Sequence, residues 1–143
     1  MFMKNRIKNI STFLILVILL YSCCFGAKED YLGNNIYLSE FDNVDRRILY
    51  QSERCTTSGV EIVPITVLEI AYNNKWIIVK TGNGRERTDE KYFKYWVIKN
   101  DYKNLPDSET VKINTTEFNN LQEFDNFLAI NKIGLKLKNI DGN

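Results

Sequence analysis

The sequence predicts an α+β fold, in which a small antiparallel β-meander of four to six strands carries one C-terminal helix and follows a signal peptide. Three observations predict this arrangement. Short β-rich runs alternate with turn residues through the middle of the chain. The hydrophobic pattern changes to a helical period near the C-terminus. The N-terminus combines cations with a short apolar run.

The N-terminus is typical of a signal peptide. Lys4, Arg6 and Lys8 precede the apolar run Ile10–Leu20, which fits a signal-peptide core and is shorter than the roughly 20 residues of a spanning helix. An uncleaved signal anchor is the less favoured alternative. Removing residues 1–22 removes three positive charges and turns the formal charge of +1 into −2. Such a domain has no electrostatic reason to bind nucleic acid.

The run Leu20-Tyr21-Ser22-Cys23 resembles the lipobox of bacterial lipoproteins. The resemblance implies a diacylglyceryl thioether on Cys23 and cleavage before it, and two or three acyl chains give stable membrane anchoring. Cys24 fits less well, because Tyr21 and Cys23 would then occupy the selective positions. We therefore expect one domain in 143 residues, organised as a signal peptide at 1–22, a lipidated tether at 23–33 and a β-rich globular domain at 34–143.

The lipobox implies a location in the bacterial cell envelope, at the outer membrane if the cell is Gram-negative. The membrane is then a partner through the lipid anchor. Lys28-Glu29-Asp30 resembles the surface-export signal of some Gram-negative lipoproteins. Because this motif is only three residues long, a periplasmic and a surface-facing orientation both stay open.

The clearest element of the domain is a hairpin, with strands at Val67–Tyr72 and Lys75–Lys80 around Asn73-Asn74. Asparagine tolerates positive φ and suits tight turns. A two-residue turn would pair Ile70 with Ile77 and Leu68 with Val79 on an apolar face that we expect to be core.

Other strands are expected at Asn35–Phe41, after a turn at Gly33-Asn34, and at Arg47–Gln51 and Tyr92–Lys99. The last of these would carry Phe93, Tyr95 and Val97 on one face and Lys94, Trp96 and Ile98 on the other. A helix is expected from an N-cap at Asn114, with Glu117 completing a capping box, to Ile130-Asn131. Ile133–Leu137 then alternates like a short final strand.

The run V-x-x-I-A-Y-N-N-K-W-I-I-V-K, followed by Y-W-V-I-K and by a helix with an L-K-L ending, resembles a family of small bacterial lipoproteins of unknown function. The resemblance covers roughly residues 34–137. It implies a one-domain secreted lipoprotein, and it carries over no catalytic residue.

Several kinds of chemistry are excluded by composition. The chain has no histidine, which removes His-based triads and His-ligated metals, and three cysteines cannot form a Cys₄ zinc site. If Cys23 carries lipid, Cys24 and Cys55 could form one disulfide. The alternative, a free Cys24 with a small buried Cys55, is favoured because spacing alone fixes no disulfide geometry. We expect no cofactor and no metal site.

Two further patterns point to binding or catalysis. Gly82-x-Gly84-Arg85-x-Arg87 could cradle an anion, but it lacks the helix and the Lys-Ser/Thr pair of a phosphate loop, so a solvated loop is favoured. Carboxylates could serve a glycosidase, but their spacing across a cleft is not visible in sequence. The adjacent or near-adjacent acidic residues are Glu29-Asp30, Asp89-Glu90 and Asp42 with Asp45.

Four aromatic residues, Tyr92, Tyr95, Trp96 and Tyr102, could form a platform for a sugar or a partner protein. The alternative is that they are strand and core residues of a small β-domain. We expect a non-enzymatic, membrane-anchored binding module whose partner is an envelope protein or glycan. The alternative function is a small His-free envelope hydrolase that uses carboxylates.

Overall fold

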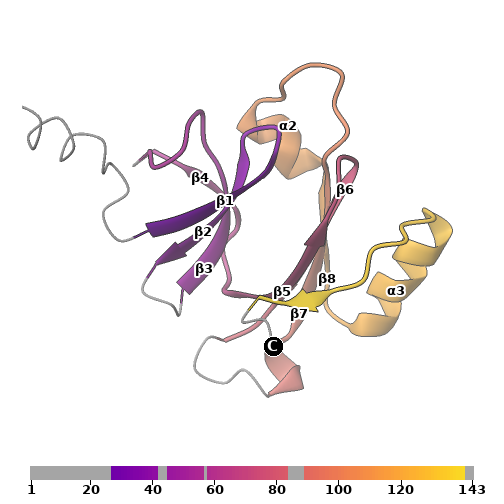
Figure 1. Ribbon diagram of the computed structural model, residues 1–143. Coiled ribbons are helices and arrows are strands. Elements are labelled where there is room, and N and C mark those ends of the chain that lie inside the picture. Colours follow the sequence, from indigo (N-terminus) through magenta and orange to yellow (C-terminus); the bar gives the residue numbers. More distant parts are fainter. Residues whose placement is uncertain (1–26, 42–44, 57, 84–88, 141–143) are drawn as a thin grey trace, which may run out of the picture.

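The computed structural model describes residues 27–41, 45–56, 58–83 and 89–140. These residues form an α+β domain of two antiparallel sheets with a short C-terminal helix (Figure 1). The expected signal peptide at 1–22 and the lipidation residue Cys23 lie outside the described residues. The α+β class is therefore confirmed, while the strand number exceeds the four to six expected.

Sheet A has four strands in sequence order, and sheet B has five strands in the order β8-β7-β6-β5-β9. The strands of sheet A are β1 (Ala27–Gly33), β2 (Ile36–Phe41), β3 (Asp45–Tyr50) and β4 (Val60–Val63). Those of sheet B are β5 (Val67–Tyr72), β6 (Trp76–Thr81), β7 (Lys94–Lys99), β8 (Thr115–Phe118) and β9 (Lys138–Asn139).

Strand β1 corrects the expected boundary between tether and domain. Residues 27–31 and Gly33 pair with β2, and Leu32, at an irregularity between Tyr31 and Gly33, is buried in the core. Asn34 and Asn35 then turn the chain with φ of 49° and 62°, a left-handed conformation that asparagine tolerates. The turn predicted at Gly33-Asn34 is present one residue later, at Asn34-Asn35, and Gly33 ends β1. The folded domain includes most of the segment expected to be a tether.

The main core lies between the two sheets. Leu38 and Ile48 of sheet A meet Ile77, Val79 and Ile98 of sheet B, and all five are buried. Helix α2 (Ser108–Ile113) closes this core through the fully buried Val111. The apolar face that alternation predicted on β6 is therefore confirmed as core.

The outer face of sheet B is covered by helix α3 (Leu121–Ile130) (Figure 1). Phe124 is buried there, with its ring centroid 5.1 Å from that of Tyr95 and 5.9 Å from that of Phe118. Both faces of β7 are consequently buried, one against sheet A and the other against α3. The predicted division of its side chains between the faces is confirmed.

The β5–β6 hairpin has a different register from the one expected. Ile70 pairs with Val79, and Tyr72 pairs with Ile77, so the pairing is displaced by two residues. The Asn73 side chain explains the longer turn, because its Oδ1 accepts hydrogen bonds from the backbone N–H groups of Lys75 and Trp76 at 2.8 and 2.9 Å. A shift by two keeps Ile70, Ile77 and Val79 on their predicted face. An irregularity between Val67 and Glu69 leaves Leu68 without a cross-strand partner, so Val67 takes the core position predicted for Leu68.

The C-terminal helix starts later than predicted. Asn114 is the C-cap of α2, strand β8 follows it, and Asn120 is the N-cap of α3, with Oδ1 accepting from Glu123 N–H at 2.9 Å. The predicted end near Ile130-Asn131 is confirmed. Residues 133–137 are not a strand, and pairing with β5 occurs at β9 instead. The alternation of apolar residues in this segment reflects burial, because Ile133, Leu135 and Leu137 pack on the α3 side of sheet B.

The outer face of sheet A is covered by residues 51–56, which a buried carboxylate holds in place. Glu29 is only 5% exposed, and its Oε2 accepts hydrogen bonds from Gln51 Nε2 at 2.9 Å and from the backbone N–H of Cys55 at 2.7 Å. Its Oε1 accepts from Ser39 Oγ at 3.5 Å. We call Glu29, Ser39, Gln51 and Cys55 the Glu29 network.

Cys55 is disulfide-bonded and half-buried. The described residues contain no other cysteine, so its partner lies outside them. The favoured expectation of a small buried Cys55 without a disulfide is therefore wrong. Loop residues fold back over sheet A here, which cysteine spacing could not reveal.

Candidate functional site

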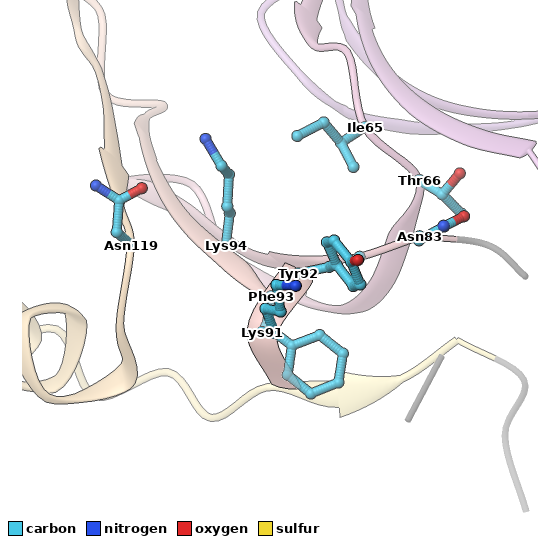
Figure 2. A pocket seen from close by; sticks show the side chains of 9 residues that line it. Ile65, Thr66, Asn83, Lys91, Tyr92, Phe93, Lys94 and Asn119 are labelled. Atoms are coloured by element: carbon cyan, nitrogen blue, oxygen red, sulfur yellow. The ribbon is translucent and has the colours of Figure 1, made fainter. Parts of the chain in front are cut away.

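A pocket of about 510 Å³ lies at the end of sheet B where β4 passes into β5 (Figure 2). Its polar lining comes from Thr66, Asn83, Lys91, Lys94 and Asn119. Figure 2 shows Lys94 and Asn119 on one side, Thr66 and Asn83 on the other, and the Tyr92 ring between them. We call this the Tyr92 pocket.

A short 3₁₀ helix, η1 (Glu90–Tyr92), places the aromatic ring of the pocket. Asp89 caps it, with the carboxylate accepting from Lys91 N–H at 3.1 Å. The helix ends where β7 begins, so Tyr92 stays on the surface while the following strand enters the sheet. Tyr92 is 43% exposed, and a large aromatic residue exposed beside a pocket is typical of a contact surface.

The charges around the pocket are partly paired. Lys94 forms an ion pair with Glu117 on the neighbouring strand β8. Lys91 lies with Nζ 5.2 Å from the centroid of the Tyr92 ring. Thr66 Oγ1 is 3.5 Å from an Asp45 carboxylate oxygen. The described lining thus offers amides, ammonium groups and a hydroxyl beside an aromatic ring, and none of those lining residues is a carboxylate.

The four aromatic residues singled out in the sequence do not form one exposed platform. Tyr92 lines the pocket, whereas Tyr95 and Trp96 are each 7% exposed and Tyr102 is half-buried. Trp96 Nε1 donates to Thr81 Oγ1 at 3.0 Å within the core. The expectation of an accessible Trp96 surface is therefore wrong, because sheet A covers that face of β7.

Two of these tyrosines are also poor acid–base groups. Burial raises the pKa of Tyr95 and the pKa of Tyr102 above the ordinary value for a phenol. A raised pKa makes each of these phenols a weaker acid. The role these residues play is in packing, with Tyr95 against Phe124 and Tyr102 at the edge of the main core.

The carboxylates considered for catalysis have separate structural roles. Glu29 belongs to the buried network on sheet A, while its neighbour Asp30 is exposed. Asp89 caps η1, and Asp45 pairs with Arg47. Asp42 and residues 84–88 of the glycine-arginine loop lie outside the described residues. The burial of Glu29 also gives it a role in folding that is independent of any export signal.

Within residues 27–41, 45–56, 58–83 and 89–140, no three His, Cys, Asp or Glu side chains are grouped as metal ligands. In the same part of the chain, no helix has the length and apolar character needed to cross a membrane. Comparisons with protein-family models, curated proteins and solved structures found no match. The resemblance to a small lipoprotein family therefore stays a prediction.

Most of the pocket residues were missed by sequence reasoning. Thr66, Asn83 and Asn119 each follow or precede a strand, and they come together only because β5, β6 and β8 end at the same side of sheet B. Isolated polar residues at strand ends are ordinary in loops. Among the pocket residues, the sequence singled out Tyr92 as a partner-binding candidate, and Gly82 only as part of a loop for which the solvated alternative was favoured.

Proposed function

We propose that this chain is a bacterial envelope lipoprotein, anchored through lipid on Cys23, and that its domain binds an envelope component at the Tyr92 pocket without catalysing a reaction. The membrane is its partner through the anchor, and the ligand is an envelope protein or glycan. The proposal uses no cofactor and no metal. Anchoring raises the effective concentration of the domain near such a ligand, which favours even weak binding.

The observation that carries the proposal is the composition of the pocket. Its volume of about 510 Å³ suits a small molecule or a side-chain-sized part of a larger partner. Tyr92 supplies an exposed apolar ring, and Asn83, Asn119 and Lys91 supply hydrogen-bond donors. These groups can recognise a ligand with oxygen acceptors. General acid–base catalysis most often uses an imidazole or a carboxylate, and the described side chains that line the pocket include neither.

The anchor is tested by metabolic labelling with palmitate. The wild-type chain and Cys24→Ala should incorporate the label, and Cys23→Ala should not. Label retained in Cys23→Ala would contradict lipidation at that residue.

The pocket is tested by photocrosslinking in cells that carry the full chain. A photoreactive p-benzoylphenylalanine replacing Tyr92 should give a discrete adduct with an envelope component. The matched control places the same group at Ile130, which is 80% exposed on α3 and remote in sequence from the pocket. The same adducts at both positions, or none at Tyr92, would contradict binding at the pocket. Turnover of an envelope substrate that one carboxylate substitution abolishes would overturn the non-enzymatic role.

A further inference from the structure

A second groove, of about 370 Å³, lies at the opposite end of the strands from the Tyr92 pocket. It lies between the β1–β2 turn of sheet A and the β5–β6 turn of sheet B, which Figure 1 shows at the upper end of the two sheets. Its lining includes two tyrosines and four asparagines. These are Tyr31, Tyr72, Asn34, Asn73, Asn74 and Asn100. We call it the asparagine groove.

Asn100 holds the two turns together. It is 3% exposed, and its Nδ2 donates to the backbone carbonyls of Leu32 at 2.8 Å and Asn73 at 3.1 Å. Asn34 Nδ2 in turn donates to the carbonyl oxygen and to Oδ1 of Asn100, at 2.8 and 3.0 Å. One buried amide thus bonds to both sheets, so the floor of the groove is fixed before any ligand arrives.

Gly33 allows this close approach. A Cβ atom at that position would lie 2.8 Å from Asn100 Nδ2. The backbone also has a φ of +114°, which residues other than glycine rarely adopt. The absence of a side chain at Gly33 therefore lets the β1–β2 turn lie directly against the Asn100 amide. A larger residue there would push the turn away from Asn100 and change the shape of the groove.

The two tyrosines are exposed although they flank a rigid groove. Tyr31 is 57% exposed and Tyr72 is 48% exposed. Tyr31 is oriented by contact with Tyr37, with ring centroids 5.1 Å apart and planes inclined by 58°. Exposed aromatic rings beside a preformed concave surface are typical of ligand sites, and burial in the fold does not account for either ring.

The chemistry of the lining selects the class of ligand. None of the described side chains lining the groove carries a charge, which disfavours a charged ligand. Amide groups donate and accept hydrogen bonds, as sugar hydroxyls do, and phenol rings offer apolar faces with polar tips. A sugar ring presents hydroxyls at its edge and C–H groups on its faces, so it matches both features.

We propose that the asparagine groove is a binding site for a neutral oligosaccharide, with Tyr31 and Tyr72 contacting sugar rings. The Asn74 amide, Asn73 Nδ2 and Asn34 Oδ1 would pair with sugar hydroxyls, while Asn100 holds the groove in shape. Strand β1 begins at the other end of the sheet, at Ala27, so the groove lies at the end of β1 remote from the expected anchor. This site is independent of the Tyr92 pocket and of the ligand proposed for it.

The experiment measures binding of the full chain, in detergent, to maltopentaose, mannopentaose and the pentamer of N-acetylglucosamine by isothermal titration calorimetry. At least one should bind, and Tyr31→Ala and Tyr72→Ala should each raise its Kd about ten-fold. Tyr31→Phe and Tyr72→Phe should keep the Kd within about three-fold, because the ring is retained. Both tyrosines are exposed, so circular dichroism melts of the variants should match the wild type.

Tyr92→Ala is the matched control, since it removes an exposed tyrosine at the other end of the domain. Binding that Tyr92→Ala weakens and the Tyr31 and Tyr72 variants do not would assign the sugar to the Tyr92 pocket and overturn the proposal for the groove. Absence of binding to all three oligosaccharides would overturn it as well. Neither result depends on whether Cys23 carries lipid.

Discussion

The outer faces of the two sheets are covered in different ways. On sheet B, helix α3 places Phe124 against Tyr95 and Phe118, and the contact is apolar. On sheet A, residues 51–56 cover the face through the Glu29 network and the disulfide of Cys55. A helix can bury an apolar stripe, whereas a short irregular loop has few side chains to bury and many backbone groups to satisfy.

This difference determines which of the two segments can be predicted from the sequence. The helical spacing of apolar residues predicts α3, because a helix that packs on a sheet needs a continuous apolar stripe. A loop held by one carboxylate and one covalent bond leaves no periodic pattern. Stability should therefore depend on packing at one face and on polar and covalent bonds at the other.

The largest effect is expected at the apolar covering. Phe124→Ala should lower the free energy of unfolding by about 3–5 kcal/mol, because it removes a fully buried ring and leaves a cavity. Chemical denaturation measures the loss. The control is Leu121→Ala in the same helix, where the side chain is 50% exposed and the loss should stay below about 1 kcal/mol. Equal losses in the two variants would mean that α3 is not packed through Phe124.

The next largest effect is expected at the disulfide. Cys55→Ser should lower the free energy of unfolding by about 2–4 kcal/mol, because the unfolded chain gains freedom. A reductant should destabilise the wild-type chain similarly and leave Cys55→Ser unchanged. Ser58→Ala, an exposed position nearby in the same loop, should change little. No response of the wild type to reductant would contradict a stabilising disulfide.

The identity of the partner sharpens this prediction. Lipid on Cys23 would leave Cys24 as the only other thiol in the chain. Trypsin should release Cys55–Lys75 as one peptide linked to Cys23–Lys28, and mass spectrometry without reductant should detect the pair. Cys24→Ser should abolish the linkage. A linkage that survives this substitution would assign the disulfide to Cys23 and remove the thiol that the lipid requires.

A smaller effect is expected in the Glu29 network. Glu29→Ala should cost about 1–3 kcal/mol, because the Cys55 N–H and the Gln51 amide lose a buried acceptor. Glu29→Gln should cost less, since one amide oxygen still accepts and the new NH₂ faces the Ser39 hydroxyl. Asp30→Ala, at the exposed neighbour, provides the baseline. If all three variants melt alike, the carboxylate does not hold the loop.

The parts of the fold that follow hydrophobic periodicity could be predicted. The alternation of Ile77 and Val79, the two faces of β7 and the end of α3 all agree with the structure. Strand β1 could not be predicted, because it is a polar edge strand with Leu32 as its buried apolar residue. The hairpin register was missed because the Asn73 side chain, rather than a two-residue turn, closes the loop.

The sites were predictable only to a small extent. Tyr92 was singled out, but its pocket neighbours come from three separate strand ends. Trp96 was interpreted as a contact residue because alternation predicts which face of a strand a side chain lies on. It does not predict whether other elements cover both faces, as they do for β7. Asn34, Asn73 and Asn74 looked like turn residues, which they are, whereas Asn100 had no distinguishing pattern. These asparagines lie around Asn100 because of the way the two sheets pack together. Local sequence patterns do not specify the distance between two sheets.

The start of β1 at Ala27 limits how far the domain can travel. Three residues lie between Cys23 and Ala27, and the four Cα–Cα steps that join them reach about 14 Å at full extension. With lipid on Cys23, as proposed, the domain would diffuse with the bilayer surface instead of sampling the space above it. The seven residues of β1 would add about 23 Å before the chain turns at the asparagine groove. A ligand for that groove must therefore come within a few nanometres of the membrane.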